Sequence, residues 1–224
     1  MGNASKVGMA VTEWILKGIQ NGELVPGQRL VERDLCETLN ASHTEVGTAL
    51  TNLSLDKVLE QVPNRGARVR AMSLQEALQT AEVRMVVECL CAARAAERIA
   101  DDQIEELRVF GREMEALAAE ENIFGYSELV NRLISAVVRI ANQPVAEELL
   151  KLLRNRTIGS RFGLRFRADR AKVSLPHWLA LINAICERNP DEARKAVERR
   201  VESVYDAISS LAETENRVFS KRLF

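Results

Sequence analysis

The sequence is poor in the side chains on which enzymatic and metal chemistry most often depend. It has two histidines, four cysteines and only 4% aromatic residues. No Ser–His–Asp grouping and no glycine-rich phosphate loop is evident, so we do not expect an enzyme. Cys36, Cys89, Cys91 and Cys186 lack the spacing of metal ligands, which predicts buried free thiols in a reducing compartment.

Long apolar runs and an excess of charge are also missing. No stretch approaches the roughly 18 apolar residues of a membrane span, and the first residues do not resemble a signal peptide, so a cytoplasmic location without membrane association is expected. With 224 residues, 46% hydrophobic and 28% charged, the chain is long enough for two globular domains. Its net charge is −1. Residues 1–72 hold eight basic and eight acidic residues, so any nucleic acid must be bound by a local patch.

Residues 1–72 have the pattern of three helices followed by a β-hairpin. Apolar residues at 11, 14, 15 and 19 predict a first helix, Pro26-Gly27 a turn, and residues 31–39 a second short helix. Ser42 is a suitable N-cap for a third helix. The segments "KVLEQV" and "ARVRAM" alternate around the turn signal "PNRG" and predict a hairpin. This order is typical of a winged helix-turn-helix DNA-binding domain.

Residues 73–224 show only helical periodicity, with apolar residues on single faces and charges opposite. The pattern predicts an antiparallel bundle of about six helices. Their expected ranges are 74–100, 102–121, 125–141, 144–167, 174–188 and 190–215, with Asp101, Ser174 and Pro190 as starts. The predicted fold is therefore mainly α, with a winged domain over 1–72 and an all-helical domain over 73–224.

Several stretches resemble the GntR family of bacterial transcription regulators. In the first domain these are "GELVPGQRLVERDLCETLNAS" and "PNRGARV". In the second, "AEVRMVVECLCAARAAERIA" and "LPHWLALINAICERNPDEARKAVERRV" resemble the first and last helices of its FCD subfamily, in the VanR-like group. The resemblance covers essentially the whole chain. It implies a DNA-reading head and a ligand-binding, dimerising bundle.

The recognition helix departs from the family at its functional positions. GntR recognition helices commonly read Ser-Arg-Thr-Pro-Val-Arg-Glu-Ala-Leu, whereas this chain reads "SHTEVGTAL" from residue 42. His43 and Gly47 replace the two arginines, and Glu45 replaces the proline. A bidentate Arg–guanine contact contributes about 1–3 kcal/mol of discrimination, which Gly47 cannot supply. Glu45 favours the helix N-terminus but would repel phosphates, or alternatively could accept a hydrogen bond from cytosine.

The resemblance still implies a set of DNA contacts. Hydroxyl groups and the helix N-terminus can bond phosphate, and Arg33 and the wing match family contacts. The predicted DNA-binding residues are Arg33, Ser42, His43, Thr44, Arg65, Gly66 and Arg68. Three interpretations remain open: DNA reading is altered or weakened, DNA binding is lost, or DNA reading is little changed.

The metal site of the FCD subfamily is also changed. Many members hold a divalent metal with one Asp or Asn and three His, and the matching positions here are Val130, Ile134, His177 and Arg200. Valine and isoleucine have no lone pair to donate, so we expect neither a metal nor another cofactor.

Arg200 in place of a ligating histidine suggests a metal-free site for a carboxylate. A guanidinium offers a fixed positive charge and a bidentate fork. Arg84 and Glu88 match a family pair near the effector pocket. The predicted effector-binding residues are Arg84, Val130, Ile134, His177 and Arg200. In the alternative interpretation, Arg200 pairs with an acidic neighbour and His177 is an ordinary histidine at the edge of the core.

The sequence therefore predicts a homodimeric regulator that binds a double-stranded DNA operator and a small carboxylate effector. The alternative is a divergent paralogue that has lost DNA binding and acts as a ligand-binding or heterodimerising modulator.

Overall fold

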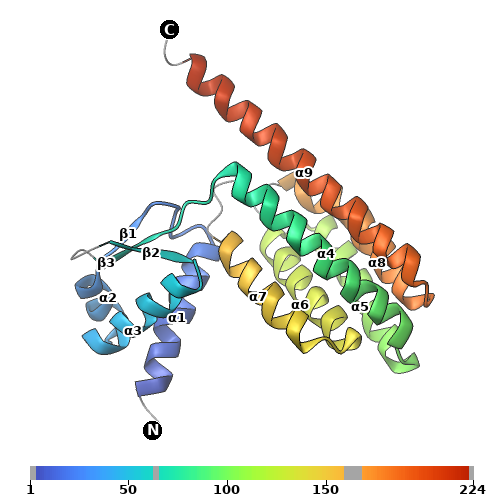
Figure 1. The fold of residues 1–224 in the computed structure, drawn as a ribbon, viewed down its shortest axis with the longest axis horizontal. Coiled ribbons are helices and arrows are strands. Elements are labelled where there is room, and N and C mark those ends of the chain that lie inside the picture. The colour runs from blue at the N-terminus through green and yellow to red at the C-terminus, as the bar shows by residue number, and fades with distance from the viewer. Residues whose placement is uncertain (1–3, 63–65, 159–167, 222–224) are drawn as a thin grey trace. The chain divides into compact units, whose positions relative to one another are not determined.

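The computed structural model describes residues 4–62, 66–158 and 168–221 (Figure 1). The chain divides into two compact units, residues 1–73 with 151–161, and residues 74–150 with 162–224. None of the described helices is both long and apolar enough to cross a membrane.

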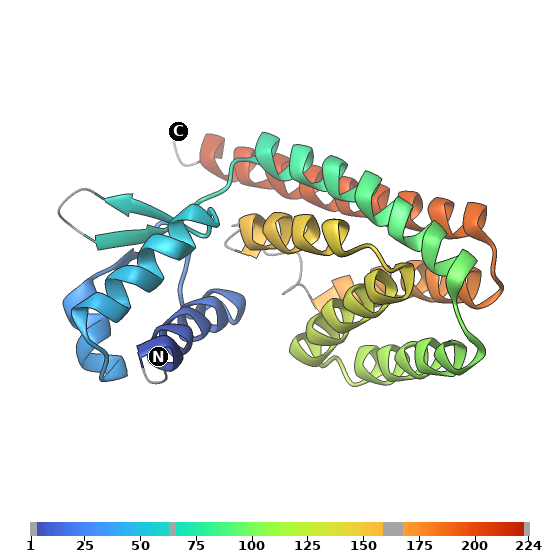
Figure 2. The same cartoon turned by 60° about the horizontal axis from the view of Figure 1, so that its bottom comes forward.

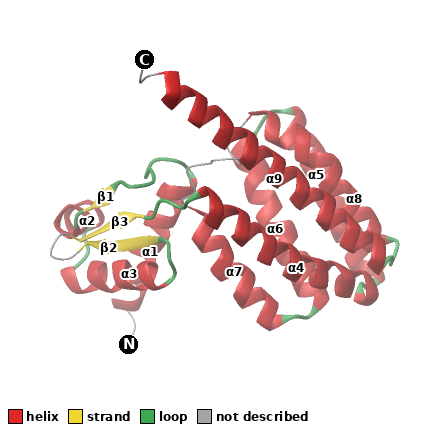
Figure 3. Cartoon of the chain, turned by 45° about the horizontal axis from the view of Figure 1, so that its top comes forward, coloured by secondary structure: helices red, strands yellow, loops and turns green. Residues whose placement is uncertain are grey.

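The first unit is a winged helix-turn-helix. Its helices are α1 (Ala4–Gln20), α2 (Glu32–Leu39) and α3 (His43–Leu55), and its strands are β1 (Arg29–Leu30), β2 (Leu59–Val62) and β3 (Gly66–Val69). The strands form one antiparallel sheet in the order β1-β3-β2, drawn in yellow in Figure 3. The unit therefore has the predicted helices and hairpin.

The apolar face of α3 holds this unit together. Val46, Ala49, Leu50 and Leu53 are all at least 97% buried, and their spacing places them on one side of the helix. Ile15 of α1 and residues of β2 and β3 complete the same cluster. The burial of α3 fixes which of its side chains face outward, and these are the ones available to a partner.

Strand β1 was not predicted. The sequence indicated only a turn over residues 25–30, but Arg29 and Leu30 pair with Arg68 and Ala67 of β3. After the turn at Gly27 (φ 83°), the Gly27 N–H donates to Val69 O at 2.8 Å and starts the pairing. A two-residue strand is too short to show an alternating pattern.

The second unit is an antiparallel helical bundle (Figures 1 and 2). Its helices are α4 (Leu74–Arg98), α5 (Asp101–Ala119), α6 (Ile123–Ala141), α8 (Ala168–Cys186) and α9 (Pro190–Lys221). Helix α7 (Pro144–Ile158) begins in this unit and continues into residues grouped with the first. Helix α9 packs along both α4 and α8, and α6 packs against α4 and α5. Residues of α4, α8 and α9 thereby come together.

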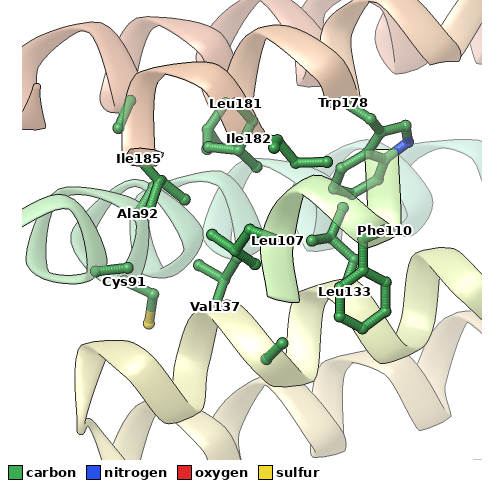
Figure 4. Packing of buried hydrophobic residues seen from close by; sticks show 14 of the residues in the cluster. Cys91, Ala92, Leu107, Phe110, Leu133, Val137, Trp178, Leu181, Ile182 and Ile185 are labelled. Atoms are coloured by element: carbon green, nitrogen blue, oxygen red, sulfur yellow. The ribbon is translucent and has the colours of Figure 1, made fainter. Parts of the chain in front are cut away.

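The bundle core is built mainly from aliphatic and small side chains, with a few aromatic rings among them. Figure 4 shows Leu107 and Phe110 of α5, Val137 of α6, and Trp178 and Ile182 of α8 directed toward one another. Alanines on α4, including Ala92, Ala95 and Ala96, allow its neighbours to approach closely.

The largest differences between the predicted and the observed helix bounds are at the start of α8 and the end of α9. Helix α8 begins at Ala168, not at Ser174, so Pro176 lies inside it. Ser174 is buried and shares a 2.9 Å hydrogen bond with the Tyr126 hydroxyl instead of capping a helix. Proline is common in a first helical turn, which is why the pattern suggested a later start. Helix α9 extends to Lys221, and residues 159–167, predicted as the end of α7, lie outside the described residues.

Two glycine-to-alanine substitutions should change stability in opposite directions. Gly66 has φ +85°, and a Cβ there would lie 2.5 Å from Leu30 O, whereas a Cβ at Gly47 meets nothing within 4 Å. We expect Gly66→Ala to lower the free energy of unfolding by about 1–3 kcal/mol or more, because alanine is strained in this conformation. Gly47→Ala should raise it by about 1 kcal/mol, because alanine favours the helix interior.

Urea unfolding followed by Trp14 fluorescence, in a common Trp178→Phe background, measures both changes. A Gly66→Ala variant as stable as its parent would show that this contact does not constrain the wing.

Candidate DNA interface and effector site

The N-terminus of α3 is closed by a capping box between Ser42 and Glu45. Glu45 N–H donates to Ser42 Oγ at 3.3 Å, and Ser42 N–H donates to Glu45 Oε2 at 2.9 Å. The Ser42 hydroxyl also donates to Glu45 Oε2 at 2.7 Å. These hydrogen bonds lower the pKa of the Glu45 carboxyl, so the side chain is ionised at neutral pH. Ser42 is the predicted N-cap.

The capping box defines what the first turn of α3 presents. Glu45 is folded back onto the helix N-terminus through Oε2, which leaves Oε1 as the oxygen that could accept a hydrogen bond from a cytosine. The Ser42 hydroxyl is engaged in the same cap, and a phosphate contact from it would compete with Glu45. His43 and Thr44 are exposed on the same turn. Phosphate and base contacts by these residues stay predictions.

An open cleft of about 750 Å³ lies between α2, α3 and the sheet. Its lining includes Arg29, Arg33, His43, Gly47 and Gly66. Three predicted DNA-binding residues, Arg33, His43 and Gly66, thus share one concave surface. Arg29 joins them because β1 brings it there, and sequence reasoning missed it for that reason.

The remaining predicted contacts differ in their surroundings. Arg68 is bound to Glu60 on the neighbouring strand, with Arg68 Nη2 2.6 Å and Nε 2.7 Å from Glu60 Oε2. Its charge is therefore already partnered. The ion pair of Arg33 with Glu37 is longer, at 3.4 Å, and both side chains are more than two-thirds exposed. Arg65 lies outside the described residues.

In the bundle, Glu88 lies between two arginines. Arg84, one turn earlier on α4, donates to Glu88 Oε1 from Nη2 at 2.6 Å and from Nε at 3.2 Å. Arg200 of α9 donates from Nη2 to Glu88 Oε2. Glu88 and Arg200 are each 93% buried, and the Arg84 side chain is one-quarter exposed. We call Arg84, Glu88 and Arg200 the charged triad.

An indole ring supports the Arg200 end of the triad. The Arg200 Cζ lies 4.4 Å from the centre of the Trp178 ring, which is a cation–π distance. The buried Arg200 Nε has no hydrogen-bond partner among the described residues. Sequence reasoning missed Trp178, although its position next to His177 could have indicated it.

The triad keeps its charges despite burial. Burial raises the pKa of the Glu88 carboxyl, but the charges and hydrogen bonds of Arg200 and Arg84 outweigh it and hold that pKa below its usual range. Guanidinium groups stay protonated in proteins. The triad therefore contains two positive charges and one negative charge.

The other predicted effector residues lie nearby with different roles. Ile134 lines a cavity of about 20 Å³ together with Glu88 and Trp178, whereas Val130 and His177 are not among its lining residues. Val130 packs against the bundle core. His177 is half-buried; burial, and then Arg170, Arg199 and Arg200, lower the pKa of its imidazole, so it is neutral at pH 7. Of the predicted effector residues, Arg84 and Arg200 thus bind Glu88, and Ile134 lines the cavity beside it.

The four positions that match metal ligands do not fit a divalent metal. Val130 and Ile134 offer no donor atoms, and Arg200 is bound to Glu88. Among the residues that the structure describes, no three His, Cys, Asp or Glu side chains are grouped so that they could hold a metal. The four cysteines are free, and of these only Cys91 is fully buried, so the expected burial is wrong for the other three.

Comparisons with known proteins agree with this architecture. Residues 8–69 match the family described as "Bacterial regulatory proteins, gntR family", and residues 79–203 match the FCD domain. The chain is 20% identical over 198 residues to the HTH-type transcriptional repressor RspR of Escherichia coli strain K12, over 88% of this chain and 87% of that protein. It is 25% identical over 183 residues to the Nta operon transcriptional regulator of Aminobacter aminovorans, over 82% and 85%.

Solved structures show the same fold. Escherichia coli McbR/YncC superposes with a TM-score of 0.81 at 18% identity, covering 95% of this chain and 100% of that one. A putative GntR regulator from Rhodococcus sp. RHA1 gives a TM-score of 0.74 at 21% identity, covering 91% and 97%. The FCD match alone spans more than half of the chain. The chain therefore belongs to the GntR family of bacterial transcription regulators, with an N-terminal winged helix and a C-terminal FCD domain.

Proposed function

We propose that this regulator binds an operator with reduced sequence discrimination and senses a small organic acid through its FCD domain. The observation that carries the proposal is the charged triad, because two arginines around one carboxylate leave a net positive charge at a largely buried position. A carboxylate ligand would neutralise it. The triad begins ten residues into α4, the helix that directly follows the winged unit, so a ligand acts on the helix covalently joined to the reading head.

The shape of the winged unit supports DNA binding through its cleft. Arg33 and His43 line it, and Arg33 is more than two-thirds exposed. Contacts from such side chains to phosphate groups fix the place of a protein on the duplex without reading its sequence. The loss of arginines at 43 and 47 removes the side chains best suited to guanine.

A second candidate function is a paralogue that no longer binds DNA. Two observations favour it. Glu45 is ionised at the start of the recognition helix, where it would repel phosphate, and α3 carries no lysine or arginine. In this case the protein would act as a ligand-binding or heterodimerising modulator of another regulator.

Selection of bound fragments from a random DNA pool separates the two candidates. We expect the purified protein to enrich a degenerate palindrome at about 50 mM salt and to lose most binding at about 200 mM, because phosphate contacts release counterions. Enrichment without a motif would indicate phosphate binding alone. If no DNA is retained at either salt concentration, the protein does not bind DNA, as the second candidate function requires.

Arginines at residues 43 and 47 should increase the affinity of the winged unit for DNA. A side chain at residue 47 has open space, and His43 is exposed, so His43→Arg with Gly47→Arg adds two donors without a clash. We expect at least about tenfold tighter DNA binding and a sharper motif. The control is Thr48→Arg with Asn52→Arg, which adds equal charge to exposed positions of α3 that line a different groove. Equal gains in both pairs would mean that charge, and not position, determines binding.

An exposed apolar row on α4 supports the proposed homodimer. Val83, Val86 and Leu90 are 48%, 64% and 45% exposed, and their spacing places them on one face. We expect sedimentation at micromolar concentration to show a dimer, and Val86→Glu to shift it toward the 25.0 kDa monomer. Val109→Glu on α5 is the control for a charge at a partly exposed valine. A wild-type protein that sediments only as a monomer would contradict the proposal.

A further inference from the structure

We propose that the acid sensed at the charged triad is a monocarboxylate with an apolar tail, and that Glu88 sets this preference by fixing the charge of the site. The inference rests on the proposed acid sensing and adds the ligand class. It follows from the number of charges in the triad and from the side chains beside it.

The charge balance of the triad selects a ligand with one negative charge. Arg84 and Arg200 are positive and Glu88 is negative, which leaves one positive charge uncompensated. Arg200 Nε–H is on the same edge of the guanidinium as the Nη2 that binds Glu88, and it lacks a partner among the described residues. One carboxylate can accept this N–H and bring the site to neutrality.

The imidazole and the two thiols next to the triad add no charge to this count. His177 is neutral at pH 7 because burial and the charges of Arg170, Arg199 and Arg200 lower its pKa. Burial raises the pKa of the Cys89 and Cys91 thiols to about 11, and nearby carboxylates add to the rise. Both are uncharged. Glu88 and Arg200 are the fully buried charged side chains among the described residues.

The surroundings of Glu88 match an apolar tail. Beside the carboxylate, the cavity is lined by aliphatic side chains and one indole: Cys91, Ala92, Ile134, Val137, Val138, Trp178, Leu181 and Val197. A second carboxylate on the ligand would bring the site to an excess of one negative charge among side chains that cannot bond it. Burying an unpaired charge in this way is strongly unfavourable.

The tail can enter only if the bundle opens. The cavity of about 20 Å³ has room for only about one water molecule, so a tail must displace side chains. Trp178 of α8 lies against Arg200 and also lines this cavity, so its indole is one of the side chains that a tail would have to move. The head group has an approach from solvent beside Arg84, whose side chain is one-quarter exposed.

Matched acids of equal length test the inference. Isothermal titration calorimetry at constant ionic strength compares butyrate with succinate, hexanoate with adipate, and 4-methylbenzoate with terephthalate. In the pairs whose monocarboxylate binds, we expect the wild-type protein to bind it about tenfold more tightly than the dicarboxylate, or tighter still. The reason is that the second charge of the dicarboxylate stays unpaired.

Variants that change the charge of the triad sharpen the test. Glu88→Gln raises the net charge to two and should reduce the preference for monocarboxylates, because a second negative charge then no longer leaves the site with a negative excess. Arg84→Gln lowers it to zero and should weaken both classes. Glu97→Gln, on the same helix but in an exposed ion pair with Arg94 at 2.8 Å, should leave the preference unchanged. If Glu88→Gln does not fold, the wild-type pairs and Arg84→Gln decide the question.

The outcomes separate the inference from the function on which it rests. If the wild-type protein binds dicarboxylates as tightly as monocarboxylates, the charge rule is overturned while acid sensing stands. The same conclusion follows if the Glu88→Gln variant folds and keeps the wild-type preference. Wild type that binds none of the six acids overturns acid sensing itself.

Discussion

A buried carboxylate is the constraint on which the arrangement of the bundle depends. Glu88 has almost no access to water, so it can remain ionised only where positive charge is placed beside it. Arg84 supplies one charge from the same helix, and Arg200 supplies the other from α9. Breaking a buried ion pair from one side costs about 3–5 kcal/mol. The packing of α4 on α9, and of Trp178 on Arg200, is therefore tied to one charge balance.

The winged unit shows a different compromise, between forming a helix and attracting DNA. Glu45 closes the first turn of α3 with Ser42, and such capping contributes about 0.5–2 kcal/mol to helix stability. The same carboxylate carries negative charge to the surface that would approach phosphate. The proline that family members have at this position would avoid that repulsion but could not cap. Arg29 and Arg33 in the adjacent cleft offset part of the repulsion.

Much of this fold was predictable because its signals are local. The Ser42 cap, the apolar stripe of α3, the hairpin and the Arg84–Glu88 spacing are all set by residues within a few positions of each other. The missed features are non-local. Strand β1 exists because β3 is there to pair with it, and Ser174 lies inside α8, where its hydroxyl shares a hydrogen bond with Tyr126 of another helix. Glu88 and Arg200 are 112 residues apart, so only the family resemblance placed them near one site, and the indole beneath Arg200 stayed unnoticed.

Each of the two units contains one of the two tryptophans, so each carries its own intrinsic fluorophore. Trp14 of α1 is 36% exposed, so its emission follows the polarity of water around the winged unit. Trp178 is 5% exposed and lies against a guanidinium, so its emission occurs at shorter wavelength and depends on that one cation. The fluorescence of the chain is therefore the sum of two contributions, one from Trp14 in the winged unit and one from Trp178 in the bundle.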